Sequence, residues 1–237
     1  MKGVILAGGT GSRLFPLTKV TNKHLLPVGN QPMIFYPVNK LIQAGIKDIL
    51  IVTGVEHMGD VVQLLGSGKD FNCKFTYRVQ DEAGGIAQAL LLAEDFANNG
   101  PLTVILGDNI FQTSIAEMVA NYTSGAKLLL KEVKDPMRFG VATVSGNKIT
   151  SIVEKPSDPK SNYAVTGIYI YDANVFDIIR TCRPSARGEL EISDVNAAYL
   201  KEDQVSYSIL NGWWSDAGTL TSLAKATELV TKHPIHE

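Results

Sequence analysis

The chain has 237 residues, of which 45% are hydrophobic and 19% charged, a composition that excludes a disordered or fibrous protein. Its 22 Lys and Arg residues nearly balance 24 Asp and Glu residues, and the net charge of −2 argues against nucleic acid or an anionic membrane as a partner. Cys73 and Cys182 lie far apart, which favours neither a disulfide framework nor a zinc site. We therefore expect a single domain over residues 1–237, in a reducing cytoplasm and without a membrane segment.

Short β-branched runs alternate with helical patterns through the first half of the chain. Strands are expected at residues 3–7, 49–53, 75–79 and 103–106. Apolar positions spaced i, i+4, i+7 and i+8 predict a helix over residues 34–44, and similar spacing predicts another over residues 86–97. This alternation predicts an α/β fold with a doubly wound, mostly parallel sheet, whose ligands lie outside the carboxyl ends of the strands.

The second half of the chain changes character, because strand-like runs follow one another with little room for helices. These runs occupy residues 128–133, 141–144, 149–154 and 165–171. After them we expect helices at 174–180 and 192–200, a strand at 205–210, a helix at 219–232 and a frayed tail at 233–237. The expected sheet is therefore mixed.

The first predicted strand runs into a glycine-rich segment, Gly8-Gly9-Thr10-Gly11-Ser12-Arg13. Missing Cβ atoms let successive backbone N–H groups approach a phosphate chain, and Arg13 adds a planar set of donors. Lys23 supplies a second cation nearby in the sequence. Leu14 replaces the third glycine of the dinucleotide fingerprint, and Gly68-Lys69 lacks the flanking residues of a P-loop. The segment predicts a phosphate site, with an ordinary glycine-rich turn as the alternative.

The sequence around this segment resembles the nucleotide-binding signature of the sugar-nucleotide pyrophosphorylases, a nucleotidyltransferase family. The signature covers residues 6–14 and continues through residues 23–28. Further motifs match in order along nearly the whole chain, at Gln80 with 85–89, and at 106–109, 139–141, 154–156, 162–169, 187–192 and 214–219. The chain departs from the thymidylyl branch at His24, where members often carry Gln, and at residues 81–84, which replace a more proline-rich segment.

The resemblance implies a Rossmann-like nucleotidyltransferase fold, with a nucleotide-binding part at about residues 1–110 and a sugar-phosphate-binding part at about 111–237. It implies thymidylyl transfer from dTTP to glucose 1-phosphate, giving dTDP-glucose and pyrophosphate, with Mg²⁺ as cofactor and a homo-oligomer as the assembly. The product would serve deoxysugar synthesis, such as dTDP-rhamnose for polysaccharides. Uridylyl or guanylyl transfer to a hexose 1-phosphate, or a non-catalytic sugar-nucleotide sensor, are the alternatives.

The resemblance also assigns roles to single residues. Asp108 and Asp216 would together hold Mg²⁺, although an aspartate at either position is also typical of a turn or a helix N-cap. The residues expected to bind the nucleotide are Leu6, Gly8, Gly9, Gly11, Arg13, Lys23, Gln80 and Gly85. Those expected to bind the sugar phosphate are Asn109, Gly140, Glu154, Lys155, Val165 and Trp214. Those expected to carry the catalysis, by positioning phosphates and stabilising charge, are Arg13, Lys23, Asp108, Lys155 and Asp216.

Base recognition is assigned to Gln80, whose amide offers donors and an acceptor to the edge of a pyrimidine. Gly85 would let the base approach the backbone closely. Each of these residues also has an ordinary structural interpretation. A lone glutamine after a strand is often a surface residue, and Glu154 with Lys155 could be an exposed pair at a strand end. Trp214 could belong to the apolar core.

The last expectation concerns regulation. Longer thymidylyltransferases continue beyond the final helix into further helices that help form a second nucleotide site, whereas here only residues 233–237 follow Lys232. We therefore expect feedback through a second site to be weak or absent.

Overall fold

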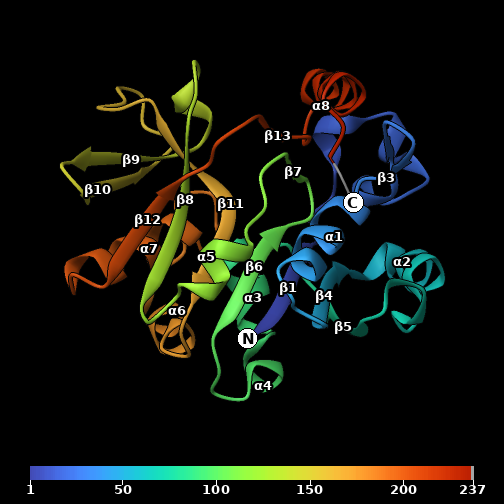
Figure 1. Ribbon diagram of the computed structural model, residues 1–237, viewed down its shortest axis with the longest axis horizontal. Helices are drawn as coiled ribbons and strands as arrows, with labels where there is room; N and C mark the ends of the chain where they lie inside the picture. Colours follow the sequence, from blue (N-terminus) through green and yellow to red (C-terminus); the bar gives the residue numbers. More distant parts are fainter. Residues whose placement is uncertain (236–237) are drawn as a thin grey trace.

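The central strands form a sheet that is buried on both faces, because their successive apolar side chains point alternately to one face and the other. The structure is a computed structural model and describes residues 1–235 (Figure 1). The strands β1 (Lys2–Ala7), β4 (Asp48–Gly54), β5 (Lys74–Gln80) and β6 (Leu102–Leu106) pair in parallel in the order β6-β1-β4-β5. In β1, Val4 and Leu6 belong to one apolar core, while Ile5 and Ala7 belong to the other. The predicted doubly wound arrangement is therefore confirmed.

The second half of the chain extends this sheet, mainly with antiparallel strands. The strands are β8 (Ala126–Glu132), β9 (Gly140–Ser145), β10 (Lys148–Glu154), β11 (Tyr163–Tyr171) and β12 (Val205–Ile209). β11 pairs antiparallel with β6, β8 and β9, and so joins the two halves into one nine-stranded sheet. β10 pairs with β9 at one edge, and β12 pairs in parallel with β8. The sheet is mixed, and the expected single-domain α/β class is confirmed.

Helices pack on both faces of the sheet through apolar stripes. One core contains side chains of α3 (Ile86–Leu91), α6 (Val175–Thr181) and α7 (Ile192–Lys201), and the other those of α1 (Phe35–Gln43), α2 (Met58–Leu65) and α5 (Ala116–Ala120). In α1, Val38 and Leu41 are fully buried against the sheet, as the spacing of apolar residues predicts. Each such side chain contributes about 1.5–3 kcal/mol of hydrophobic stabilisation.

A two-stranded sheet outside the main one brings two distant segments together. β7 (Asn109–Phe111) pairs antiparallel with β13 (Trp214–Asp216), in a register that sets Asp216 opposite Asn109. The helix α8 (Leu220–Lys232) follows directly and contacts β13 and the short strand β2 (Pro27–Val28), which pairs with β3 (Gln31–Pro32). Thr219 caps α8, because its Oγ1 accepts the Ser222 N–H at 3.1 Å while the Ser222 Oγ accepts the Thr219 N–H at 3.0 Å.

The structure differs from the predicted elements in short segments. Residues 86–97 form two helices, α3 and α4 (Glu94–Ala97), because the Ala93 N–H donates to the Leu90 carbonyl and closes α3 with a tight turn. The sequence does not predict the helices α2 and α5 or the short strands β2, β3, β7 and β13. In the predicted frayed tail, Ile235 packs against a small core with Trp213 and Val230, while residues 236–237 lie outside the described part. Within residues 1–235, no helix has both the length and the apolar character needed to cross a membrane.

Candidate functional site

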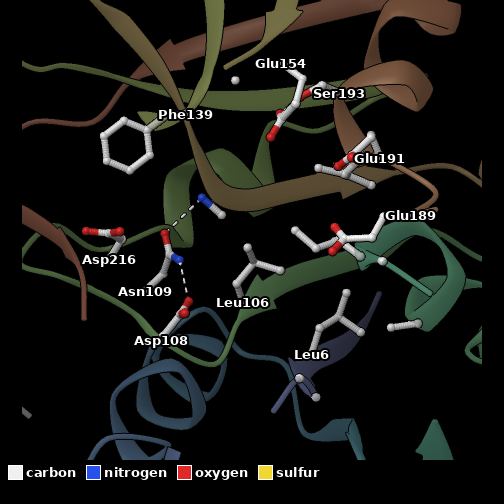
Figure 2. A pocket seen from close by; sticks show the side chains of 18 of the residues that line it. Leu6, Leu106, Asp108, Asn109, Phe139, Glu154, Glu189, Glu191, Ser193 and Asp216 are labelled. Carbon is white, nitrogen blue, oxygen red and sulfur yellow. Dashed lines mark hydrogen bonds between the residues drawn. The ribbon is translucent and has the colours of Figure 1, made fainter. Parts of the chain in front are cut away.

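A cavity of about 680 Å³ lies where the carboxyl ends of β1, β5 and β6 face β9, β10 and β11 (Figure 2). This is the position that strand and helix alternation predicts for a ligand. The predicted site residues that line it are Leu6, Gly8, Gly9, Arg13, Lys23, Gln80, Gly85, Asp108, Asn109, Gly140, Glu154, Lys155, Val165, Trp214 and Asp216. The structure therefore gathers nearly the whole predicted set, from segments throughout the chain, around one space.

Gly11 belongs to the predicted set but lies behind the cavity lining. It has a φ of 63° and begins the short 3₁₀ turn η1 (Ser12–Leu14), where a left-handed residue starts the turn. A Cβ at this position would lie 3.0 Å from the Thr18 side chain and 3.4 Å from the Cβ of Lys23. Gly11 thus shapes the loop that carries Arg13 and lets Lys23 pack closely beneath it.

Asp108 follows β6 through Gly107 and is held by a largely buried cation. Its Oδ2 accepts a hydrogen bond from Nζ of Lys23 at 2.7 Å. Its Oδ1 accepts one from Nδ2 of Asn109 at 3.1 Å (Figure 2). Burial, the largest single influence, would raise the pKa of this carboxyl group, but the charge of Lys23 and the hydrogen bonds from Lys23 and Asn109 contribute to a combined opposing effect that lowers the pKa to about 2. Asp108 is therefore an anion throughout the neutral pH range.

Asp216 is the second carboxylate and reaches the site through the pairing of β13 with β7. Nη2 of Arg138 donates to its Oδ2 at 3.0 Å, from the 3₁₀ turn η6 (Pro136–Arg138). Burial raises the pKa of Asp216, and the negative charge of Asp108 adds to this rise, while Arg138 opposes it. Because Asp108 and Asp216 repel each other at this end of the cavity, a positive charge that binds between them would be stabilised.

The Asn109 side chain links Asp108 to β11 and to Trp214 of β13. Its Oδ1 accepts hydrogen bonds from the indole Nε1 of Trp214 at 2.8 Å and from the backbone N–H of Gly167 at 2.9 Å. Its Nδ2 donates to Asp108, so the amide orientation follows from donors that cannot act as acceptors. Asn109 and Trp214 are therefore parts of one buried network, rather than independent wall residues.

The glycine-rich loop presents open backbone to the cavity. Gly9 has a φ of 90°, and a Cβ built on it would meet nothing within 4 Å. A Cβ on Gly218 would lie 3.3 Å from both Nη2 of Arg13 and Oδ2 of Asp108, so the guanidinium group lies beside the carboxylate pair. The loop and Arg13 form a cationic rim suited to phosphate oxygens.

The opposite end of the cavity carries a cluster of polar side chains. Glu154 accepts a hydrogen bond from the Ser193 hydroxyl at 2.6 Å and lies 3.2 Å from Nζ of Lys155. Arg187 bridges this region, with Nη2 at 2.7 Å from Glu191 and 3.6 Å from Glu154. Lys155 has a φ of 40°, a conformation that a residue with a side chain rarely adopts, and its N–H donates to the Phe139 carbonyl at 3.0 Å. Strain of this kind is typical of functional positions.

Several lining residues received no role from the sequence. They are Ala83, Ile86, Ala89, Leu106, Arg138, Phe139, Gly167, Tyr169, Arg187, Glu189, Glu191, Ile192 and Ser193. Phe139 and residues 187–192 lie in motifs that carry the family resemblance. Those motifs are therefore the sequence signal that points to these residues. The sequence gives no such signal for Arg138, because an exposed arginine two residues after a proline is typical of many loops.

The acidic side chains of the cavity are too few to form a complete metal site by themselves. Within residues 1–235, no group of three or more His, Cys, Asp or Glu side chains is arranged to hold an ion. Asp108 and Asp216 are the acidic pair near the glycine-rich loop, and Mg²⁺ commonly takes one or two carboxylates and completes its shell with water and phosphate oxygens. The donor set therefore fits a hard cation that arrives with a phosphate ligand.

Known proteins of similar sequence share nearly the whole length of the chain. A family model described as Nucleotidyl transferase matches residues 2–233. A glucose-1-phosphate thymidylyltransferase of Neisseria meningitidis is 46% identical over 237 residues, which cover 97% of this chain and 82% of the relative.

Solved structures show the same fold. A Bacillus anthracis crystal structure, described as a candidate glucose-1-phosphate thymidylyltransferase in complex with a sucrose, is 59% identical, has a TM-score of 0.94 and covers 100% of this chain and 98% of that one. A UDP-glucose pyrophosphorylase complexed with UDP-glucose is 26% identical, has a TM-score of 0.88 and covers 98% of both chains. The agreement extends over both halves of the sheet.

Proposed function

Because the chain belongs to the nucleotidyl transferase family and is an enzyme, we propose that it transfers a thymidylyl group from dTTP to glucose 1-phosphate. The products are dTDP-glucose and pyrophosphate. The observation that supports this most directly is the arrangement of the cavity, which has the glycine-rich loop with Arg13 and Lys23 at one end and Glu154 with Lys155 at the other. Two phosphorylated substrates can therefore bind side by side.

The reaction requires an oxygen of the sugar phosphate to attack the α-phosphorus of dTTP as pyrophosphate leaves. The attacking group is already an anion, so no general base and no covalent enzyme intermediate are required. The protein must hold two mutually repelling anions in line and stabilise the charge that develops on the leaving group. Arg13 and Lys23 would bind the triphosphate and Lys155 the sugar phosphate, which is supported by the position of all three in the cavity lining.

We propose Mg²⁺ as the cofactor, held by Asp108 and Asp216. When bound, the ion would neutralise phosphate charge and orient the reacting groups. Lys23 would keep Asp108 ionised and in place, while Asn109 would hold the spacing between β7 and β13. Glu154 would accept hydrogen bonds from the sugar hydroxyls, and the second N–H of the Asn109 amide would donate one to them. Val165 and the Trp214 ring, held by its hydrogen bond to Asn109, would give apolar surface to the sugar.

The nucleotide would contact mainly residues 1–110 and the sugar phosphate mainly residues 111–237, with Asp216 joining the two parts at the metal. The dTDP-glucose would serve deoxysugar and polysaccharide synthesis. Cys73 and Cys182 are free thiols, which supports a reducing cytoplasm as the location. A homo-oligomer stays a prediction.

Pyrophosphate release across a matrix of substrates tests this proposal. The triphosphates are dTTP, UTP and GTP, and the sugar phosphates are the 1-phosphates of glucose, galactose and mannose. We expect the fastest release with dTTP and glucose 1-phosphate, and slower release with UTP. A preference for GTP would assign the chain to another branch of the family, and nucleotide binding without turnover of any pair would indicate a sensor.

A further inference from the structure

Gln88 makes an unusual set of contacts beside the predicted base-binding residue. It lies on α3, one turn beyond Gly84 and Gly85. Its Oε1 accepts two hydrogen bonds, from the backbone N–H of Gly84 at 3.1 Å and from Nε2 of Gln80 at 2.7 Å. The same Nε2 of Gln80 lies 3.3 Å from the carbonyl oxygen of Gly85. Gln80 is 7% exposed, so its amide has little water to bond instead.

These contacts determine the positions of the oxygen and the NH₂ group in the side-chain amides of Gln80 and Gln88. The Gly84 N–H can only donate, so the Gln88 atom that meets it must be the oxygen. That oxygen can only accept, so the Gln80 atom that meets it must be the NH₂ group. The Gly85 carbonyl, which can also only accept, requires the same orientation. Two backbone groups of residues 84–85 therefore specify the orientation of the Gln80 amide, one directly and one through Gln88.

The oxygen of Gln80 is consequently directed away from Gln88 and toward Gly8. A Cβ built on Gly8 would lie only 2.5 Å from Oε1 of Gln80, so the glycine is needed for this oxygen to occupy its place. Gly8 and Gln80 both line the cavity, whereas Gln88 lies on α3 outside the cavity lining. Oε1 of Gln80 is therefore a hydrogen-bond acceptor at this part of the cavity wall.

An acceptor at this point distinguishes between pyrimidines. Thymine and uracil carry a hydrogen on N3, which donates, whereas the N3 of cytosine is an acceptor and its neighbouring exocyclic group is an amine. A fixed acceptor opposite N3 pairs with the first two bases, whereas cytosine would have to place the lone pair of its N3 against the same oxygen. Unpaired polar groups in a closed site are the main source of strong discrimination.

We propose that Gln88 is a positioning residue for base selection, which acts by preventing the Gln80 amide from rotating by half a turn. This inference rests on the proposed function, because it assumes that a pyrimidine triphosphate binds beside Gln80. Without the Gln88 oxygen, the two orientations of Gln80 become closer in energy. The rotated amide presents its NH₂ group, which donates to N3 of cytosine.

The test compares Gln88→Leu, which removes the acceptor at similar volume, with Gln88→Glu, which keeps an acceptor oxygen for both donors. Gln63→Leu on the exposed face of α2 is the matched control. For each protein, kcat/KM is measured for dTTP and dCTP with glucose 1-phosphate, and dissociation constants for both nucleotides are measured by calorimetry. We expect Gln88→Leu to lower the preference for dTTP over dCTP by roughly 10-fold or more, which corresponds to one lost hydrogen-bond preference. Gln88→Glu and Gln63→Leu should retain the preference.

An unchanged ratio in folded Gln88→Leu would overturn the proposal, as would an equal loss of selectivity in Gln88→Glu. If the leucine variant does not fold, Gln88→Met removes the same acceptor with a more flexible side chain and is expected to give the same shift. Failure of the proposed function has a different result, because the wild-type protein then releases no pyrophosphate from dTTP. The calorimetric preference of the wild type and its variants still tests the role of Gln88 in that case.

Discussion

Arg138 donates a hydrogen bond to Asp216 across 3.0 Å, although the two residues lie 78 positions apart in the sequence. The other carboxylate of the pair, Asp108, is held by Lys23. The side chains of Lys23 and Asp108 are 14% and 13% exposed, whereas those of Arg138 and Asp216 are 43% and 21% exposed. The Arg138 ion pair is therefore the weaker and more easily separated of the two.

Arg138→Ala should strengthen the binding of a divalent metal to the enzyme. The guanidinium group occupies Oδ2 of Asp216, an atom that a metal would need, and an ion pair of this exposure contributes about 1 kcal/mol or less. We expect the Mn²⁺ dissociation constant, measured by electron paramagnetic resonance, to fall by roughly 3- to 5-fold. Arg183→Ala, which removes an exposed arginine outside the cavity lining, is the control. Weaker Mn²⁺ binding in Arg138→Ala would contradict this account.

Asp108→Asn and Asp216→Asn should each remove most turnover and leave the fold intact. A neutral amide cannot balance the charge of a metal between two phosphates, and the loss of one well-placed electrostatic group typically costs about 10²–10³ in rate. Steady-state pyrophosphate release and circular dichroism would be measured together. Asp203→Asn serves as the control, because Asp203 pairs with Lys148 in an exposed position. Near-normal turnover in either cavity variant at saturating Mg²⁺ would exclude the metal assignment.

Arg13→Ala and Lys155→Ala should have opposite kinetic effects. Arg13 lies beside Asp108 at the glycine-rich loop, so its loss should lower kcat with dTTP more than it raises the KM for glucose 1-phosphate. Lys155 lies beside Glu154 at the other end of the cavity, so its loss should mainly raise that KM. Kinetics with each substrate varied in turn distinguish the two. An unchanged KM for glucose 1-phosphate in Lys155→Ala would argue against its placement.

His24 should make the protein sensitive to acid. Its ring is buried, and Nδ1–H donates to Oδ1 of Asn22 at 2.7 Å. Burial, followed by the charge of Lys23, lowers the pKa of His24 from 6.5 to about 3. Between these values the unfolded chain binds a proton that the folded protein does not, so the free energy of unfolding falls as the pH drops from about 6.5 toward 3. The full difference is on the order of 5 kcal/mol.

Urea unfolding between pH 7 and pH 4 measures this dependence. His24→Gln replaces the ring with a group that does not titrate, so we expect a smaller loss of stability over this range than in the wild type. His233→Gln, beyond the last helix, is the matched control. Equal pH dependence in His24→Gln and the wild type would show that another group causes the acid sensitivity.

Local patterns in the sequence determined the strands and long helices of the main sheet. The apolar spacing of residues 34–44 corresponds to α1 (Phe35–Gln43), and the run at 165–171 lies within β11 (Tyr163–Tyr171). These elements bury continuous apolar faces, so their periodicity is visible in the amino-acid order itself. The glycine-rich loop and its two cations are close neighbours in the sequence, and could therefore be recognised together.

Only the tertiary structure decided how the distant polar groups meet. Asp216 reaches Asp108 through two strands of three residues each, β7 and β13, which are too short to show any periodicity. Arg138 becomes a partner of Asp216 because the ring of the next residue, Phe139, packs edge-on against Trp214 of β13, a contact between distant segments that no local propensity encodes. The orientation of the Gln80 amide is likewise set by hydrogen bonds with residues of a following turn and helix. Hydrogen bonds and ion pairs depend on distance and direction in space, and a sequence specifies these only after the chain has folded.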